Sequence, residues 1–288
     1  NSKKQEIIVI NRRELDKQVA RQARDNGAKI SVKTSFQEKT KYGVRTSDGE
    51  IKCKYFVDCR GVSRLVNKDR DGILLTAQYE VYADWIREGQ VEVYFDQEKY
   101  PEFFAWVIPS GKGINTSTSI DEFLKSKGNF STIRKIFAPI WIKGPIKSFA
   151  EDNTLIVGDA AGQAKPTTAG GIFSCGMAGV FAGRAISNAL KTNDLAVLSD
   201  YEKQWREKFG KEFDKQNLAR KILARLDNNT VNKLFKSITP EIEEDISNKE
   251  DFDFHTSSIL KLLGMKGSFN TMQALVGGEI KRLIQSKA

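Results

Sequence analysis

The first part of the chain alternates short apolar runs with one amphipathic stretch. Residues 6–10, EIIVI, are rich in β-branched side chains and predict a buried strand. Between 15 and 26 apolar positions recur at helical spacing, and Gly27 follows them where a helix commonly ends. Residues 29–35 return to a strand pattern. This strand, helix, strand order predicts a piece of an α/β layer.

A hairpin and a separate antiparallel sheet are predicted next. Residues 41–46 and 50–58 flank a Ser-Asp-Gly turn at 47–49, and an Asp-Gly step is a strong hairpin signal. Alternating positions between 73 and 120 predict an antiparallel sheet, with strands at 90–95, 103–109 and 114–120. We expect this sheet to form a domain of its own.

The second half of the pattern is mainly helical. Residues 130–140 are predicted as a helix, and 154–157 as a short strand that ends at a glycine. From Ile172 onward helical spacing continues, with heavy charge over 195–226. Residues 230–288 combine short helices with an acidic patch.

Composition limits the class of protein. The chain has 288 residues, of which 40% are hydrophobic and 29% charged, which suits a globular protein of one large or two modest domains. No uncharged apolar run is long enough to span a membrane, since the best candidate, 171–190, is interrupted by Arg184. The net charge of +9 is spread out and indicates a lysine-rich surface that could meet anionic lipid or a pyrophosphate. No nucleic-acid-binding motif accompanies it, so we expect no nucleic-acid partner.

Cysteine and histidine usage argues against several kinds of site. The three cysteines, Cys53, Cys59 and Cys175, form no C-x-x-C pair, and we interpret them as mostly buried thiols in a reducing compartment. The single histidine is His255, so we expect neither a histidine-centred metal site nor a Ser-His-Asp triad. We therefore predict a cytoplasmic protein without a metal centre.

The residues that carry chemistry follow the strand at 154–157. Gly158 and Asp159 come directly after it, small residues follow, and a long glycine- and alanine-rich helix begins at about Ile172. A carboxylate at a strand end can accept hydrogen bonds from sugar or ribityl hydroxyls. The N-terminus of a helix stabilises an anion, such as the N1/O2 edge of a reduced flavin ring. The segment thus predicts a flavin site; the alternative is a tight strand-to-helix turn that binds no ligand.

The run GDAAGQAKPTTAGGI, residues 158–172, closely resembles the second flavin motif of the geranylgeranyl reductase family, FAD enzymes of the p-hydroxybenzoate hydroxylase fold superfamily. Three further stretches resemble family motifs in the same order: RRELD at 12–16, VDCRGVS at 57–63 and FAWVIP at 104–109. The resemblance runs from about residue 6 to 190, and the C-terminal third matches only in helical character.

The resemblance implies a set of cofactor-binding residues. They are Arg12, Phe36, Gly158, Asp159, Pro166, Gly170, Gly171 and Ile172. Asp159 is expected at the ribityl or phosphate region of FAD, and the backbone of Gly171 and Ile172 at the isoalloxazine ring. Arg12 is expected on the phosphate side of the cofactor, and Phe36 near its adenine half.

Substrate-binding residues are implied in the same way. Phe104, Trp106 and Ile108 would line a lipid tunnel; the alternative is the ordinary alternating core of a sheet, because cavities and cores use the same residues. No catalytic residue is assigned. The proton donor is left open among Tyr79, Tyr82, Tyr94 and Cys175.

The implied fold is α/β (α+β) in three parts. An incomplete three-layer FAD-binding domain covers 1–70 and 145–192, an antiparallel-sheet substrate domain is inserted at 71–144, and a helical domain occupies 193–288. The family's G-x-G-x-x-G loop is absent from the sequence. We therefore expect the first βαβ unit to be missing, and with it the usual pyrophosphate contact.

The activity implied by the resemblance is flavin-dependent reduction of isolated C=C bonds in isoprenoid chains, with geranylgeranyl groups of ether lipids as the favoured substrate. The implied partners are that lipid, an unidentified electron donor and, through the lysine-rich surface, an anionic membrane at its inner face. One alternative is another flavin enzyme of the superfamily, a monooxygenase or a halogenase, because residues 104–109 also resemble the halogenase W-x-W-x-I-P motif. The other is a non-catalytic lipid-binding remnant.

Overall fold

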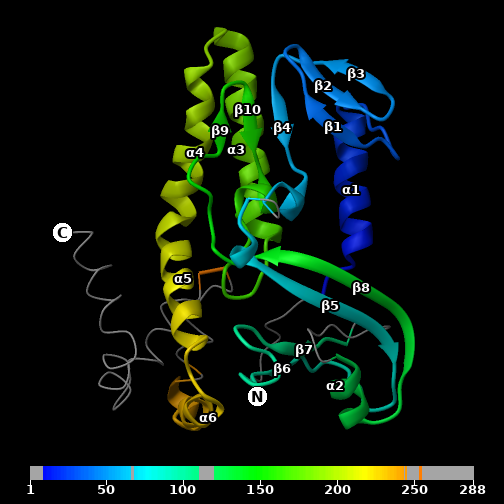
Figure 1. Ribbon diagram of the computed structural model, residues 1–288, viewed down its shortest axis with the longest axis vertical. Helices are drawn as coiled ribbons and strands as arrows, with labels where there is room; N and C mark the ends of the chain where they lie inside the picture. The colour runs from blue at the N-terminus through cyan, green and yellow to red at the C-terminus, as the bar shows by residue number, and fades with distance from the viewer. Residues whose placement is uncertain (1–8, 66–67, 110–119, 243, 245–252, 255–288) are drawn as a thin grey trace, which may run out of the picture.

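The computed structural model describes residues 9–65, 68–109, 120–242, 244 and 253–254 (Figure 1). The predicted strands at 6–10 and 114–120 fall largely outside these residues, as do His255 and most of 230–288. Within the described ranges, no helix combines the length and the apolar character of a membrane span.

Helix α1 (Arg12–Asp25) confirms the helix predicted at 15–26. The Asn11 side chain caps its first turn by accepting a hydrogen bond from the backbone N–H of Glu14 at 3.3 Å. Gly27 follows its end at φ +93°, in the left-handed region that favours glycine. No residue of α1 is buried, so tertiary packing contributes little to this helix.

The strand predicted at 29–35 is wrong. These residues are irregular and mostly exposed, Val32 at 77%, and the first strand is β1 (Phe36–Lys39). Lys33 takes φ 59°, a backbone conformation that an extended strand does not use. Apolar residues without a buried surface to pack against do not hold a strand in place.

The predicted hairpin is confirmed. β2 (Gly43–Thr46) pairs with β3 (Gly49–Lys52) across the Asp-Gly turn, where Gly49 has φ +117°, and β1 pairs with β2 on the other side. The second strand ends at Lys52 and does not continue to 58. The chain leaves this sheet there and forms β4 (Phe56–Asp58) in another sheet.

The sheet that positions the candidate site has the order β4–β10–β9. β10 (Thr154–Ile156) confirms the strand predicted at 154–157, and all of its residues are buried. It pairs in parallel with β4 and antiparallel with β9 (Ala150–Glu151). Ile156 lies opposite Asp58, so the carboxyl ends of β4 and β10 meet at one edge of the sheet. Residues that follow the two strands are thereby brought together.

A long two-stranded ribbon extends away from this sheet (Figure 1). β5 (Ile73–Tyr82) pairs antiparallel with β8 (Ser131–Trp141), and β6 (Glu92–Tyr94) pairs with β7 (Ala105–Val107). The strands predicted within 90–95 and 103–109 are confirmed as β6 and β7. Helix α2 (Ile120–Lys127) shares one buried cluster with β5 and β7, so the two ribbons pack as one unit.

The helix predicted at 130–140 is wrong, because this segment forms β8. Pro139 has no backbone N–H and would break a helix at that point, and Thr132, Ile133 and Ile136 are β-branched. Pairing with β5 along its whole length decides in favour of the strand. Helical spacing of apolar residues was the misleading signal, since a strand of this length offers matches to both periods.

The helical part begins with α3 (Ile172–Thr192), at the predicted residue. It continues through α4 (Ser199–Trp205), a π-helical turn η5 (Arg206–Gly210) and α5 (Lys211–Leu223) to α6 (Asn228–Lys236), which confirms the helical structure predicted over 195–226. Short 3-10 helices lie between other elements: η1 (Gly61–Arg64), η2 (Arg70–Gly72), η3 (Gly158–Ala161) and η4 (Ala196–Leu198).

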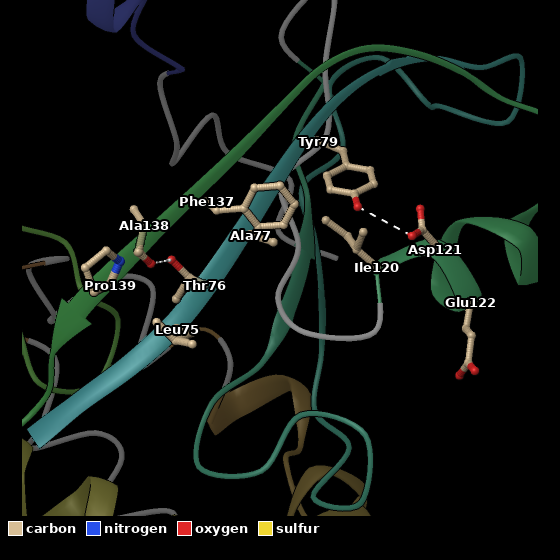
Figure 2. Close-up of a pocket in the computed structure, with 10 residues that line it drawn as sticks. All are labelled: Leu75, Thr76, Ala77, Tyr79, Ile120, Asp121, Glu122, Phe137, Ala138 and Pro139. Atoms are coloured by element: carbon tan, nitrogen blue, oxygen red, sulfur yellow. Dashed lines mark hydrogen bonds between the residues drawn. The ribbon is translucent and has the colours of Figure 1, made fainter. Parts of the chain in front are cut away.

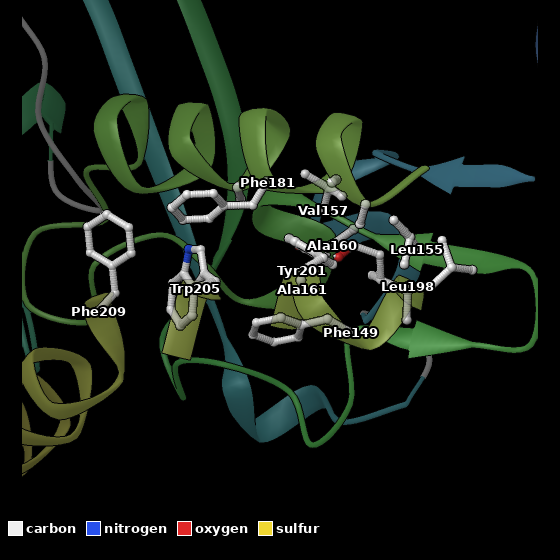
Figure 3. Packing of buried hydrophobic residues seen from close by; sticks show 14 of the residues in the cluster. Phe149, Leu155, Val157, Ala160, Ala161, Phe181, Leu198, Tyr201, Trp205 and Phe209 are labelled. Atoms are coloured by element: carbon white, nitrogen blue, oxygen red, sulfur yellow. Dashed lines mark hydrogen bonds between the residues drawn. The ribbon is translucent and has the colours of Figure 1, made fainter. Parts of the chain in front are cut away.

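The π turn keeps one row of aromatic side chains on the buried face. Tyr201, Trp205, Phe209 and Phe213 recur at every fourth position, and all are buried. In an α-helix a spacing of four drifts by about 40° per step, and the wider π turn absorbs part of that drift. Figure 3 shows Tyr201, Trp205 and Phe209 of this row on the side of α3 that carries Phe181.

This aromatic row belongs to the same buried cluster as β10, η3 and α3. The helices after α3 therefore pack directly on the elements that contain residues 158–172, the predicted flavin motif. The division of the chain into three domains stays a prediction.

Replacing Trp205 with alanine should lower the free energy of unfolding by about 3–5 kcal/mol. The indole is fully buried, and its Nε1–H donates to the Ser174 carbonyl oxygen at 3.1 Å. Urea denaturation followed by circular dichroism measures the loss. The control Phe235→Ala removes a ring that is 51% exposed and should cost under about 1 kcal/mol. Equal losses in the two variants would contradict this account of the core.

Candidate functional site

The turn after β10 depends on glycine. Gly158 takes φ +75° and Gly162 takes φ +69°, both in the left-handed region. A Cβ at Gly162 would also lie 2.1 Å from the carbonyl oxygen of Gly144. Between the two glycines, η3 turns its alanines into the core and leaves Asp159 exposed. The Asp159 carboxylate is therefore accessible to a ligand.

The side chain of Gln163 fixes this turn against the helices. It is fully buried, its Oε1 accepts from the backbone N–H of Gly158 at 2.7 Å, and its Nε2 donates to the Tyr201 hydroxyl at 2.8 Å. Tyr201 in turn donates to the Ile156 carbonyl oxygen at 2.8 Å. The backbone carbonyl of Gln163 accepts from the Ser174 hydroxyl at 2.6 Å. Strand end, loop, α3 and α4 are thus joined through one buried network.

Backbone hydrogen bonds close the loop that follows. The N–H of Lys165 donates to the carbonyl of Gly170 at 2.9 Å, and the N–H of Ala169 donates to the carbonyl of Lys165 at 2.8 Å. Pro166 and Lys165 are buried, and the Lys165 ammonium pairs with Asp253 at 2.7 Å. The predicted residues Pro166 and Gly170 therefore shape the loop that leads into α3.

The N-terminus of α3 is open to a ligand. Its N-cap is Gly171, which makes no side-chain capping hydrogen bond, and the first two residues, Ile172 and Phe173, are exposed. A Cβ at position 171 would lie 2.9 Å from the Sγ of Cys175, so only glycine leaves the arrangement undisturbed. The free N–H groups of the first turn and the positive end of the helix dipole favour an anionic group there.

Asp159 and the first turn of α3 are in contact. The Cys175 thiol donates to Asp159 Oδ1 at 3.7 Å. Burial, followed by the charge and hydrogen bond of Asp159, raises the pKa of Cys175 to about 12, so the thiol keeps its proton near neutrality. Of the four proposed proton donors, Cys175 lies in the first turn of α3, next to Asp159. Tyr79 and Tyr82 lie on β5, and Tyr94 lies on β6.

The enclosed space beside Asp159 is too small for a flavin ring. It measures about 20 Å³, room for about one water molecule, and is lined by Asp159 with Ile140, Trp141, Gly162, Ala164 and Ala169. The open side is different. Within the described residues, a Cβ added at Gly176, Gly179 or Gly183 of α3 would meet no atom within 4 Å. The glycine face of α3 is therefore open to a planar ligand.

A charged cluster occupies the end of β4. Arg60 donates from Nε and Nη2 to the two carboxylate oxygens of Asp58, each at 2.8 Å, and Arg64 approaches Asp58 at 3.2 Å. The Arg60 guanidinium lies 3.9 Å from the ring centroid of Phe36, which stacks on Phe56 at 5.5 Å. The predicted residue Phe36 is thereby tied to the end of β4, one strand away from the turn at Asp159.

Within the described residues, no hydrogen bond or ion pair joins Arg12 to this edge. Arg12 begins α1, is exposed, and pairs with Asp16 one turn further on at 3.3 Å. Figure 1 shows α1 on the far side of β4 from α3. Its role on the phosphate side of a cofactor stays a prediction.

The predicted substrate residues share one face of β7. Phe104, Trp106 and Ile108 are half-buried, and the alternate residues Ala105 and Val107 are fully buried in the cluster with β5 and α2. The core side of β7 is therefore the Ala105 side. For the face with Phe104, Trp106 and Ile108, this arrangement favours a ligand-facing wall over the ordinary core of a sheet. The role of that face in a lipid tunnel stays a prediction.

Phe104 connects this wall to the loop before α3. It lines a cavity of about 30 Å³ together with Thr167 and Arg220, and its ring lies 5.6 Å from that of Trp106. Arg220 pairs with Glu102 at 3.0 Å and so ties α5 to the start of this segment. The predicted substrate wall and the predicted cofactor loop are thus neighbours in the structure.

Sequence reasoning missed the residues whose hydrogen bonds fix the site's backbone in place. Gln163 lay within the motif and was its one large uncharged polar side chain, which was a usable signal. Tyr201 gave none, because its contacts join segments far apart in the chain. Asp58 lay in the stretch at 57–63 that resembles a family motif, and its partners Arg60 and Arg64 are close to it in the sequence. The interpretation of the cysteines as mostly buried is also wrong, since Cys59 is exposed and Cys53 and Cys175 are half-buried. Among the described residues, no group of histidine, cysteine and acidic side chains is placed to bind a metal ion.

No family model matches the chain, but individual proteins do. It is similar to an uncharacterized protein of Methanocaldococcus jannaschii, 30% identical over 219 residues that cover 69% of this chain and 55% of the relative. It is also similar to a digeranylgeranylglycerophospholipid reductase of the same organism, 28% identical over 272 residues that cover 82% of this chain and 69% of the relative. The chain thus spans about half the length of the first relative and just over two thirds of the second.

Solved structures show the same fold. A geranylgeranyl bacteriochlorophyll reductase-like protein from Thermoplasma acidophilum has a TM-score of 0.77 at 20% identity, covering 93% of this chain and 75% of that one. A myxobacterial FAD-dependent halogenase has a TM-score of 0.55 at 15% identity, covering 89% and 73%. These likenesses confirm the predicted mixed α/β fold class.

Asp58→Asn should lower the free energy of unfolding at neutral pH by about 2 kcal/mol. Burial alone would raise the pKa of Asp58, but hydrogen bonds from Arg60 and the charges of Arg60 and Arg64 outweigh it and hold the pKa below its usual range. The stabilisation is therefore present above the ordinary carboxyl pKa of about 4 and is lost as pH falls through the folded-state value. Urea titrations at successively lower pH should show the free energies of unfolding of Asp58→Asn and of the unmodified chain becoming equal.

The matched control is Glu151→Gln, which removes the exposed carboxylate that pairs with Arg64 at 3.3 Å. Such a surface pair should contribute under about 1 kcal/mol. A loss for Asp58→Asn that is independent of pH would contradict the electrostatic origin of its contribution.

Asp159→Asn should lower the pKa of the Cys175 thiol, because it removes a negative charge next to Sγ. The rate of Cys175 alkylation by iodoacetamide at a fixed mildly alkaline pH should rise several-fold, measured by mass spectrometry of the labelled peptide. Asp152→Asn, at the exposed turn before β10, should leave the rate unchanged. An unchanged rate in Asp159→Asn would show that the two groups are not in contact in solution.

Proposed function

The chain belongs to the geranylgeranyl reductase family, and from this premise we propose that it is an FAD-dependent oxidoreductase that saturates C=C bonds of isoprenoid chains. Geranylgeranyl groups of membrane ether lipids are the proposed substrate class, because relatives at 28% identity carry the name digeranylgeranylglycerophospholipid reductase. The observation that carries the proposal is the contact between the exposed Asp159 and the uncapped start of α3.

The residues of this edge fit an FAD molecule. The Asp159 carboxylate can accept hydrogen bonds from ribityl hydroxyls, and the first turn of α3 offers N–H groups to an anionic ring edge. The glycine face of α3 leaves room for a flat ring. When bound and reduced, FAD supplies the hydride for alkene reduction.

The chain's own residues would position and shield this chemistry. The buried Gln163 holds the Asp159 turn against Tyr201 and α3. Phe104 and Trp106 would exclude water and hold an apolar chain close to the ring, because an unactivated alkene accepts hydride poorly and needs close positioning.

The proposed partners follow from the same reasoning. Besides the lipid, the reaction requires an electron donor to reduce the flavin. The net charge of +9 supports peripheral contact with an anionic membrane surface on the cytoplasmic side.

Asp159→Asn should weaken FAD binding about tenfold, because one charge-assisted hydrogen bond contributes about 1.5–3 kcal/mol. Quenching of flavin fluorescence during titration of the full chain measures the affinity. Asp152→Asn is the control and should bind FAD as the unmodified chain does. Equal affinity of all three proteins would remove Asp159 from the cofactor site.

The reaction itself is tested with FAD, dithionite and a geranylgeranyl lipid without oxygen. Mass spectrometry should show a gain of two hydrogen atoms for each reduced double bond, and a lower yield with Asp159→Asn. Flavin binding without any such product would sink the proposed reaction and leave the cofactor assignment intact.

A second candidate is oxygen-dependent flavin chemistry, as in a halogenase or monooxygenase. It is favoured by the resemblance of residues 104–109 to a halogenase motif and by the likeness in fold to a halogenase. Oxygen consumption that depends on reduced flavin and added halide or organic substrate, with no alkene reduction under anaerobic conditions, would select it. A purified chain that binds no flavin at all would instead favour a lipid-binding protein without catalysis.

A further inference from the structure

A cavity of about 590 Å³ lies on one face of the β5–β8 ribbon, next to the start of α2 (Figure 2). Its wall is apolar. Leu75 stands opposite Pro139, and Ala77 stands opposite Phe137, so all four side chains share the face that the cavity covers. Leu75 and Phe137 are 68% and 69% exposed, a high value for large apolar side chains on one face. This face is therefore available to an apolar ligand.

The cavity extends along the β5–β8 ribbon, and its end at Pro139 directly precedes Ile140 and Trp141, which line the space beside Asp159. Its β5 wall runs from Leu75 to Tyr79, about 13 Å at the rise of a strand. Ala77 and Tyr79 belong to the buried cluster that contains Val107, whereas Trp106 is on the opposite face of β7. A linear chain fits this shape better than a compact molecule, and it would not compete with the wall at Phe104.

One end of the cavity is polar and carries a net negative charge. The Tyr79 hydroxyl donates to Asp121 Oδ2 at 3.5 Å (Figure 2), and the Lys135 ammonium lies 3.6 Å from Asp121 Oδ1 and 4.3 Å from the centroid of the Tyr79 ring. Glu122 adds a second carboxylate to the lining. Among the described residues at this end, two carboxylates and one ammonium give −2 + 1 = −1.

We propose that this cavity binds a linear apolar chain that ends in an uncharged hydroxyl group, and that its acidic end discriminates against a phosphate ester. A hydroxyl can donate to the Asp121 carboxylate and accept from the Tyr79 hydroxyl, so both sides of the hydrogen bond are satisfied. A phosphate at this end would be repelled by the Asp121 carboxylate and by the charge of the neighbouring Glu122, and the Lys135 ammonium is already paired with Asp121. The choice of a prenyl chain as the occupant rests on the proposed function; the site and its charge preference do not.

Farnesol and farnesyl phosphate are suitable probes, titrated calorimetrically into the full chain without reductant and with or without FAD. Farnesol should bind about tenfold more tightly than farnesyl phosphate, as expected for about 1.4 kcal/mol of like-charge repulsion. The double variant Asp121→Asn/Glu122→Gln should bring the two affinities within about twofold of each other, mainly by increasing the affinity for farnesyl phosphate. Because no redox step is measured, the result is independent of whether the chain reduces alkenes.

Phe137→Glu places a charge in the wall and should weaken farnesol binding at least about tenfold. Ile133→Glu is the matched control, since Ile133 is an exposed apolar residue of the same strand outside the lining, and it should bind farnesol normally. Circular dichroism checks that both variants fold, and FAD binding should be the same in both. If Phe137→Glu left the affinity for farnesol unchanged, the proposed site would be wrong. Farnesyl phosphate binding as tightly as farnesol would overturn its preference for an uncharged end.

Discussion

The buried amide of Gln163 is the interaction on which the candidate site depends. An amide taken out of water must find partners for its donors and acceptor, or it costs several kcal/mol, on the order of 2–7. Gln163 bonds the Gly158 N–H and the Tyr201 hydroxyl through its side chain, and Ser174 through its backbone. Those partners belong to the strand end, α4 and α3. The direction of the turn at Asp159 is therefore set by satisfying one polar group in an apolar core.

Most of the remaining core holds that network in place. The row from Tyr201 to Phe213 packs α4 and α5 onto α3 and β10, and the π turn keeps the row on the buried face. With the back of the site fixed in this way, its front can consist of backbone and small residues. Asp159, Gly171 and the glycines of α3 offer hydrogen-bond donors, an acceptor and open space, with no bulky side chain of their own to move aside.

The two faces of β7 lie in different apolar environments. One face buries Ala105 and Val107 against β5 and α2, and the cavity with the acidic end opens at the margin of that cluster. The other face directs Phe104 toward the loop at Thr167, and Trp106 packs against Phe104. A short strand with period-two alternation thus serves two separate apolar environments, one on each of its faces.

Local signals determined the parts of the structure whose cause is local. The Asp-Gly turn, the helix of α1, the strand before Gly158 and the start of α3 at Ile172 all follow from glycine conformation and periodicity over a few residues. The motif at 158–172 also indicated where the candidate site lies. The same reasoning failed at 29–35 and at 130–140, where apolar and β-branched residues suit more than one element. There only the presence or absence of a partner strand decided, and the sequence does not show the partner. The buried network of Gln163 and Tyr201 belongs to this second class, because hydrogen bonds between distant segments exist only once the chain has packed.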